Sequence, residues 1–356
     1  MSKKAIALAI AGAFSMGAFA QSSVTIYGKI DVGYSYSNIS STKFTQAANQ
    51  VNGGRIGFTG TEDLGNGLRA GFVVEQGFSA DTGTTGQNGG LGGRQSYISL
   101  KKDTWGEVRA GRQYTLLDDW AGNYSPLSTS GYAYGSAGYI VNDDQGRLNN
   151  ALTYYSPKWS GLQVSLQAAP KESTSNGAYT NSSTATLTGE SRAHYAAALN
   201  YTNGPLALGL ALSKNYGLDT DLDLNNKVLA QLGGTYDLGF LKLFAQYEYD
   251  GTKADYGVSG SDSYGKKNAY LVGINVPAGA WLFKAGIGYA ENANRSTSSI
   301  LQGSVTQFAL GADYLLSKRT KLYAGLGVLK GQYDADGTRD GQRTAKAAVT
   351  GIVHQF

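Results

Sequence analysis

The sequence predicts an all-β fold, a closed 16-stranded antiparallel transmembrane β-barrel. Three observations favour it: apolar side chains recur at every second position, short and long connections alternate along the chain, and 50 of 356 residues are glycine while none is cysteine. A membrane-spanning strand needs only about 9–11 residues with alternate side chains apolar, so the mean hydropathy of −0.27 is compatible with a membrane barrel. No run of about 18 apolar residues occurs, which excludes a bundle of membrane helices.

The first twenty residues have the three parts of a secretory signal peptide. Lys3 and Lys4 precede the uncharged stretch 5–20, which ends with small residues at Ala18 and Ala20. We therefore expect residues 1–20 to be removed and residues 21–356 to form one barrel. Cleavage would lower the formal net charge from +4 to +2, because two lysines and no acid are lost. So small a charge gives no indication of nucleic-acid binding.

The alternation is clear between Trp281 and Tyr289. Every odd position there is apolar or aromatic, while Lys284, Gly286 and Gly288 lie between. One face of such a strand suits lipid and the other suits water. Glycine and charged residues on the second face are unlike the residues in the packed core of a β-sandwich. The soluble alternative to a membrane barrel is a secreted adhesin with several sheets.

The connections fall into two classes that alternate along the chain. Seven are short, at Glu62–Gly67, Lys102–Thr104, Ser156–Ser160, Thr202–Pro205, Asp237–Gly239, Val276–Gly279 and Leu316–Thr320. Eight are long and polar, near 37–51, 79–92, 114–148, 171–190, 215–225, 251–266, 292–302 and 333–342. Together they join sixteen strands and place both termini on the short-turn side, as in bacterial outer-membrane barrels. A barrel of this size can enclose an aqueous channel.

Aromatic residues collect near the predicted strand ends, where membrane barrels carry aromatic girdles. Those assigned to the girdles are Tyr27, Trp105, Tyr154, Trp159, Tyr201 and Tyr314. Their position supports the membrane barrel over the soluble adhesin, which has no need of such belts.

Six segments carry motifs that point to one group of proteins. They are Ser23–Gly28, Gly54–Leu68, Gly111–Tyr114, Tyr154–Pro157, Leu316–Thr320 and Gly351–Phe356. Together they resemble the general-diffusion porins of β-proteobacteria, the neisserial and Burkholderia-like group. The resemblance runs along the whole mature chain. It implies a homotrimeric, sixteen-stranded porin in the outer membrane of a Gram-negative bacterium, with a third loop folded into the lumen.

The longest connection, residues 114–148, is the expected third loop. It has too few regular apolar positions to form a domain, so it either extends outward or folds into the barrel. Asp118, Asp119, Asp143 and Asp144 precede its only basic residue, Arg147. An acidic loop that faces a basic wall would produce a transverse electric field in the channel. The resemblance implies that this segment is the constriction loop.

In the β-proteobacterial porins that this sequence resembles, arginines line the constriction. Three arginines of this chain match the motifs of that family: Arg55, Arg94 and Arg147. Alternation supports Arg55, because Ile56 and Phe58 can face lipid only if Arg55 faces the lumen.

The other expected constriction residues are placed by alternation or by the loop. Arg94 is placed inward by alternation against Tyr97 and Ser99, which also turns Leu100 inward. Glu75 has inward parity and is an expected acidic partner, and Asp118 and Asp119 are the expected acids of the loop.

These features predict passive diffusion of ions and small hydrophilic solutes through a water-filled channel, with a modest anion preference set by the arginines. The expected surroundings are outer-membrane lipid and lipopolysaccharide. A ligand-specific channel and a membrane-barrel lipid hydrolase are the alternatives, since such hydrolases use His and Ser. No motif selects a nucleophile, so we expect no enzyme activity and no cofactor. The acidic segment 219–223 lacks the glycine and closing glutamate of an EF-hand calcium loop, so no metal site is expected.

Overall fold

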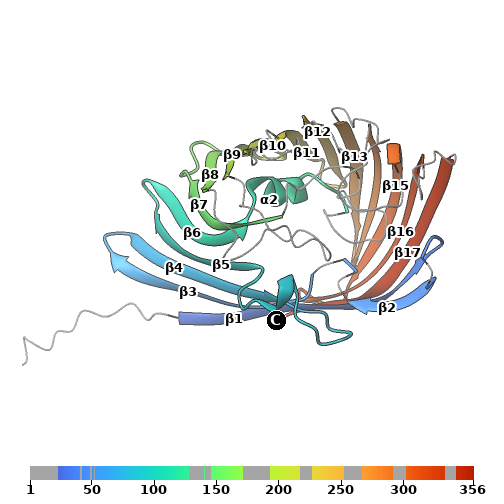
Figure 1. The fold of residues 1–356 in the computed structure, drawn as a ribbon, viewed down its shortest axis with the longest axis horizontal. Helices are drawn as coiled ribbons and strands as arrows, with labels where there is room; N and C mark the ends of the chain where they lie inside the picture. Colours follow the sequence, from blue (N-terminus) through green and yellow to red (C-terminus); the bar gives the residue numbers. More distant parts are fainter. Residues whose placement is uncertain are drawn as a thin grey trace, which may run out of the picture.

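The structure is a computed structural model that describes residues 23–40, 42–48, 50–51, 53–127, 140, 146–170, 193–216, 227–251, 267–291, 302–332 and 342–356. Most of these residues form one antiparallel sheet that closes on itself into a barrel (Figure 1). The predicted signal peptide, residues 1–20, lies outside the described residues, as do residues 128–139 and 141–145 of the predicted third loop.

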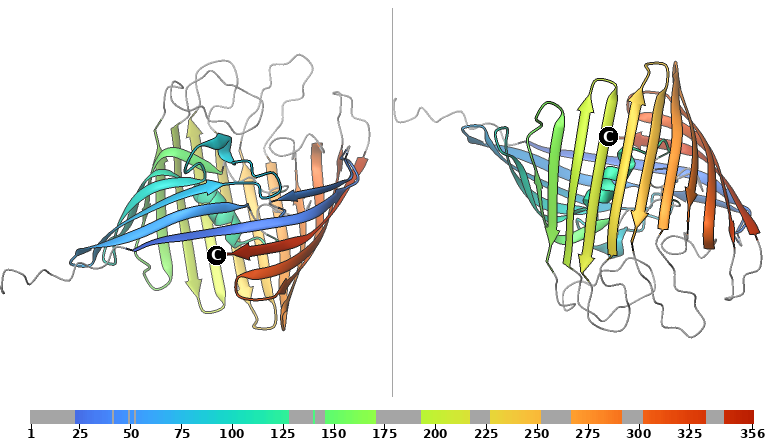
Figure 2. Two further views of the ribbon diagram at one scale, coloured as in Figure 1. Left: turned by 90° about the horizontal axis from the view of Figure 1, so that it is seen from below. Right: turned by 90° about the horizontal axis from the view of Figure 1, so that it is seen from above.

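Strands β1 to β17 follow one another along the chain, and Figure 2 shows them inclined to one another around the wall. Their bounds are β1 Ser23–Ser37, β2 Phe44–Ala48, β3 Arg55–Gly65, β4 Leu68–Gly77, β5 Gln95–Lys102, β6 Gly106–Tyr114, β7 Arg147–Tyr155, β8 Leu162–Ala169, β9 Ala193–Asn203, β10 Leu206–Tyr216, β11 Lys227–Asp237, β12 Lys242–Asp250, β13 Lys267–Ala278, β14 Trp281–Ala290, β15 Gln302–Leu315, β16 Thr320–Gln332 and β17 Gln342–Gln355. The described helices are η1 (Gln87–Gly89), a 3-10 turn, and α2 (Leu116–Asn123). Neither described helix is long and apolar enough to cross a membrane.

Strands β2 and β3 lie end to end along β1 and together act as one strand of the barrel. Residues 32–36 of β1 pair with β2, and residues 23–29 pair with β3. Counted in this way the barrel has sixteen strands, which confirms the predicted fold. The interruption between β2 and β3 carries Val51, whose side chain is only 2% exposed.

The barrel closes where β1 meets β17. Their register runs from Lys29 opposite Gln355 to Ser37 opposite Ala347. Beside it, the backbones of Gly28 and Phe356 exchange two hydrogen bonds of 3.1 Å each. Closure removes the sheet edge that would expose unpaired backbone groups to lipid hydrocarbon.

The two faces of the wall differ as the alternation predicts. Large apolar side chains point outward, and Ile98, Leu232 and Leu326 are each more than half exposed. Polar side chains point inward, and Glu248 and Gln307 are fully buried on the lumen side. Because lipid solvates the outer residues, their exposure in the isolated barrel is the expected pattern for a membrane protein.

The predicted aromatic girdle needs one correction. Trp281 and Tyr314 do pack together at the short-turn end, with ring centroids 4.7 Å apart. Tyr27, however, faces the lumen, because Ile26 and Ile30 are the exposed neighbours in β1. The assignment of Tyr27 to the girdle is therefore wrong, since strand parity decides its direction.

The predicted short connections lie between consecutive strands. Between β3 and β4, for example, Asn66 has φ 53° and Gly67 has φ 75°. This left-handed backbone favours asparagine and glycine. In an outer-membrane barrel the short turns face the periplasm.

Helix α2 lies inside the ring of strands, on the inner face of β9, β10 and β11 (Figure 1). Trp120 and Tyr124 are 1% and 3% exposed and pack against this wall. Two wall glycines make the close approach possible. A Cβ on Gly233 would lie 2.8 Å from ring atoms of both aromatic residues, and a Cβ on Gly209 would overlap them. The wall is therefore shaped to receive the helix.

The same kind of contact continues along the wall beyond α2. A Cβ on Gly273 would lie 2.5 Å from Pro126, and a Cβ on Gly288 would lie 2.7 Å from Ile140. We call Gly209, Gly233, Gly273 and Gly288 the glycine seat, because each accepts a side chain of the third loop.

Candidate functional site

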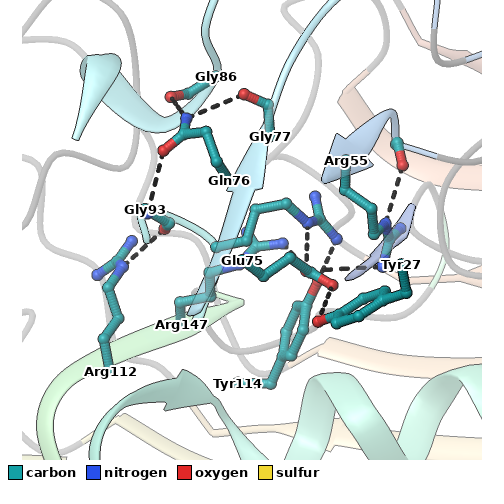
Figure 3. Close-up of polar contacts among 12 residues, drawn as sticks. Tyr27, Arg55, Glu75, Gln76, Gly77, Gly86, Gly93, Arg112, Tyr114 and Arg147 are labelled. Carbon is teal, nitrogen blue, oxygen red and sulfur yellow. Dashed lines mark hydrogen bonds and ion pairs between the residues drawn. The ribbon is translucent and has the colours of Figure 1, made fainter. Parts of the chain in front are cut away.

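Glu75 is the centre of a charged cluster on the lumen side of β1, β3 and β4 (Figure 3). Its carboxylate is almost fully buried and accepts a 2.7 Å hydrogen bond from Arg94 Nε. The Tyr27 hydroxyl donates to its other oxygen at 3.0 Å. Gly57 allows this contact, because the Tyr27 ring occupies the space of a side chain there.

Arg55 lies at the edge of this carboxylate. Its Nη1 is 3.8 Å from Glu75 Oε1, and its Nε donates to the carbonyl oxygen of Gly53 at 3.0 Å. The Arg55 side chain is 23% exposed, against 9% for Arg94, so it is the more accessible of the two guanidinium groups. Arg55 therefore presents charge to the lumen that Glu75 does not fully neutralise.

Tyr114 joins the guanidinium groups of Arg94 and Arg147 where the third loop leaves and re-enters the wall. Arg147 Nη2 donates to the Tyr114 hydroxyl at 2.7 Å, and Arg94 Nη2 donates to the same oxygen. The Arg147 guanidinium also lies 4.3 Å from the Tyr114 ring centroid, which gives a cation–π contact. Tyr114 and Arg147 face each other across the β6–β7 pair.

The cluster brings together three arginines and one buried acid. Arg94 and Arg147 both act electrostatically on Arg55, and Glu75 is the carboxylate that Arg55 and Arg94 share. One carboxylate cannot neutralise three guanidinium groups, so the cluster carries a positive charge. Positive charge on the wall of a water-filled channel attracts anions and repels cations.

The structure corrects the reasoning that placed Arg94. Ile98 and Leu100 are exposed on the outer face of β5, so Tyr97 and Ser99 face inward, and Leu100 does not. Arg94 reaches the lumen because it precedes the strand, which begins at Gln95. Its backbone N–H donates to the Glu75 carbonyl oxygen at 3.0 Å. Strand alternation therefore does not apply at this residue.

Asp118 and Asp119 lie at the start of α2, apart from the contacts of Arg55 and Arg94. The Thr115 hydroxyl caps the helix by accepting from the Asp118 N–H at 3.1 Å, and both acids lie in the first turn. Negative charge is favourable at a helix N-terminus. Asp143 and Asp144 lie outside the described residues.

Asp119 has an unusual titration. Its carboxylate is exposed to the lumen, but protein surrounds it on most sides, and this loss of bulk water raises its pKa to about 6. The charges of Arg109 and Arg147 act in the opposite direction and more weakly. Asp119 therefore changes charge close to neutral pH.

Lowering the pH from about 7 to about 5 is expected to strengthen anion preference, because Asp119 becomes neutral as the pH falls through about 6. The lumen then loses a negative charge while its arginines remain charged. The reversal potential in a KCl gradient, recorded at several pH values, measures the change. An Asp119→Asn channel should show a weaker pH dependence, and an equal dependence in this variant would assign the titration to another group.

Several lumen residues were not expected from the sequence. Tyr114 lies in the sequence motif but had no expected role, and Tyr27 was expected in the girdle. Lys29 acts electrostatically on Arg55 and Arg94 and adds a further cation to this wall. The parity of β1 could have found Tyr27 and Lys29, because Ile26 and Ile30 face outward.

A second charged group lies on the lumen side between β6 and neighbouring strands. Arg109 Nε donates to Glu107 at 2.7 Å, and its guanidinium lies 5.0 Å and 4.6 Å from the ring centroids of Tyr97 and Tyr155.

The described ranges contain no group of three His, Asp or Glu residues arranged to hold a metal ion.

Comparison with known proteins identifies a family. A family model described as Gram-negative porin matches residues 6–334. Outer membrane porin protein 32 of Delftia acidovorans is 33% identical, over 93% of this chain and 90% of that protein. An outer membrane porin protein of Bordetella pertussis is 29% identical, over 91% of this chain and 93% of that protein. Among solved structures, an anion-selective porin from Comamonas acidovorans is similar with a TM-score of 0.74 and 26% identity, over 94% and 100% of the two chains.

Proposed function

Because the chain belongs to the Gram-negative porin family of the bacterial outer membrane, we propose that its diffusion channel modestly prefers anions and is narrowest at the arginine cluster. The proposed constriction residues are Arg55, Glu75, Arg94, Asp118, Asp119 and Arg147. The described start of the third loop, residues 114–127, supplies one side of this constriction, and the wall of β3 to β5 supplies the other.

The observation that carries the anion preference is the charge ratio in the cluster. Arg94 and Arg55 share the single carboxylate of Glu75, at 2.7 Å and 3.8 Å. Arg147 instead contacts the uncharged hydroxyl of Tyr114. The excess of positive charge therefore does not depend on the distant charges of the outer loops, which salt screens over about 8–10 Å. The similarity to the anion-selective porin from Comamonas acidovorans supports the same anion preference.

The proposed solutes are inorganic ions and small hydrophilic molecules. The inner face carries many glutamine, glycine and charged residues, which suit water. We also propose a homotrimer, as the family resemblance implies, surrounded by outer-membrane lipid and lipopolysaccharide. The exposed apolar side chains of the outer face support contact with lipid.

Liposomes that contain the refolded protein are expected to become permeable to small sugars, and the rate should fall smoothly as the sugar grows. A water-filled channel discriminates by size, so no sugar should saturate the flux. Swelling of the liposomes in isosmotic sugar solutions measures these rates. Saturation by one solute would instead support a ligand-specific channel.

A further inference from the structure

We propose that Asp31 is a positioning residue of the channel, which fixes the inner end of the first loop against the wall so that this loop forms a third side of the constriction. The inference rests on the proposed constriction at Arg55 and Arg94. It concerns Val51 and Gly53, the described residues between β2 and β3 that lie inside the barrel.

Asp31 is fully buried on the inner face of β1. One of its carboxylate oxygens accepts a 2.7 Å hydrogen bond from the backbone N–H of Val51. The other accepts a 2.7 Å hydrogen bond from the Tyr323 hydroxyl of β16. A single carboxylate therefore joins the first loop to both strands that flank β17. An aliphatic side chain at position 31 could not accept from the Val51 N–H.

The position of Tyr323 is itself fixed by the wall. Its hydroxyl lies over Gly33 and Gly351, at both of which an added Cβ would overlap it. Tyr323 is 2% exposed. Because the ring cannot tilt toward the wall, its hydroxyl holds the carboxylate of Asp31 in one orientation.

Val51 extends this contact to the third loop. Its side chain belongs to an apolar cluster with Tyr323, Val349 and Val353 of the wall and Leu127 of the third loop. Val51 and Leu127 are each 2% exposed. The first and third loops are thereby fixed in one packed unit, two residues before Gly53.

Gly53 connects this unit to the charged cluster. Its carbonyl oxygen accepts from Arg55 Nε at 3.0 Å, and a Cβ on this glycine would lie 3.0 Å from Arg94 Nη1. The backbone at Gly53 therefore lies directly against both guanidinium groups. If Asp31 releases Val51, the support behind Arg55 and Arg94 moves and the opening widens.

Asp31→Asn and Tyr323→Phe test this role through single-channel conductance and reversal potential. An asparagine amide places N–H groups where one carboxylate oxygen accepted, and phenylalanine removes the donor that orients Asp31. Both variants are expected to raise conductance and lower anion preference, because ions in a wider opening pass further from the arginines. Tyr314→Phe is the matched control, since it removes the hydroxyl of a tyrosine in the outer girdle, and it should leave both quantities unchanged.

The sign of the change in anion preference shows whether Asp31 acts by positioning the first loop or only by its negative charge. Removing a negative charge without moving the loop would make the Asp31→Asn channel more anion-selective and leave Tyr323→Phe like the parent channel. That outcome would overturn the inference, as would unchanged conductance in both variants. Tyr323→Phe changes no charge, so this variant tests the positioning of the first loop even if Asp31→Asn fails to fold. A parent channel without anion preference would instead count against the proposed function, while the conductance change would still test the loop contact.

Discussion

Replacing Arg55 and Arg94 together with glutamine is expected to remove most of the anion preference of the channel. The cluster would change from three guanidinium groups and one carboxylate to one of each, Arg147 and Glu75. Two unit charges about 4 Å apart interact by about 1 kcal/mol even in bulk water. An energy of about 1 kcal/mol changes a ratio roughly fivefold. The reversal potential in a KCl gradient should therefore move close to zero.

Arg69→Gln is the matched control for this change. Arg69 lies at the short-turn end of β4, where it forms a salt bridge with Asp103 and is well exposed. Its loss should change the reversal potential much less than the loss of Arg55 alone. If loss of Arg94 leaves Glu75 unpaired and impairs folding, the single variant Arg55→Gln tests the same prediction. Equal effects of Arg55→Gln and Arg69→Gln would mean that the constriction is assigned to the wrong residues.

Placing leucine at Gly233 is expected to lower conductance strongly. The new side chain would enter the space of Trp120 and Tyr124, which lie within 2.9 Å of the added Cβ. The wall cannot yield outward without breaking strand pairing, so α2 would be pushed toward the channel axis. Overpacking of this kind costs about 1–3 kcal/mol. Single-channel recording measures the conductance, and thermal unfolding measures the loss of stability.

Gly234→Leu is the control on the next residue of the same strand. Gly234 faces outward between Leu232 and Tyr236, both exposed to the lipid side. The added leucine would therefore meet lipid and leave α2 in place. Conductance near that of the parent channel is expected for Gly234→Leu. If both variants conduct equally, α2 is not held by the glycine seat.

The barrel could be predicted from the sequence because its signals are local. Strand alternation has a period of two, and the short turns at residues such as Asn66 and Gly67 carry their own backbone preferences. The count of sixteen needed only the alternation of short and long connections. The split of one barrel strand into β2 and β3 was not predicted, because it depends on the inward turn at Val51.

The candidate site was less predictable, because its contacts join distant parts of the chain. Arg55 and Glu75 follow from parity within regular strands. Arg94 escaped that rule, because it lies just before β5 begins. Tyr114 could not be assigned, since its partners Arg94 and Arg147 lie on other elements.

The role of individual glycines also depends on contacts between distant parts of the chain. From composition, glycine indicates turns, and Gly67 fits that interpretation. Gly233 and Gly288, however, lie within strands and accept side chains of the third loop. Only the folded chain shows which glycines leave room for another segment.

A single-channel recording of the unmodified protein in a KCl gradient tests its anion preference most directly. We expect a stable open conductance with a reversal potential of the sign that chloride preference gives, because Arg55, Arg94 and Arg147 outnumber Glu75 at the proposed constriction. A reversal potential of the opposite sign, or no conductance in a correctly folded barrel, would contradict this expectation.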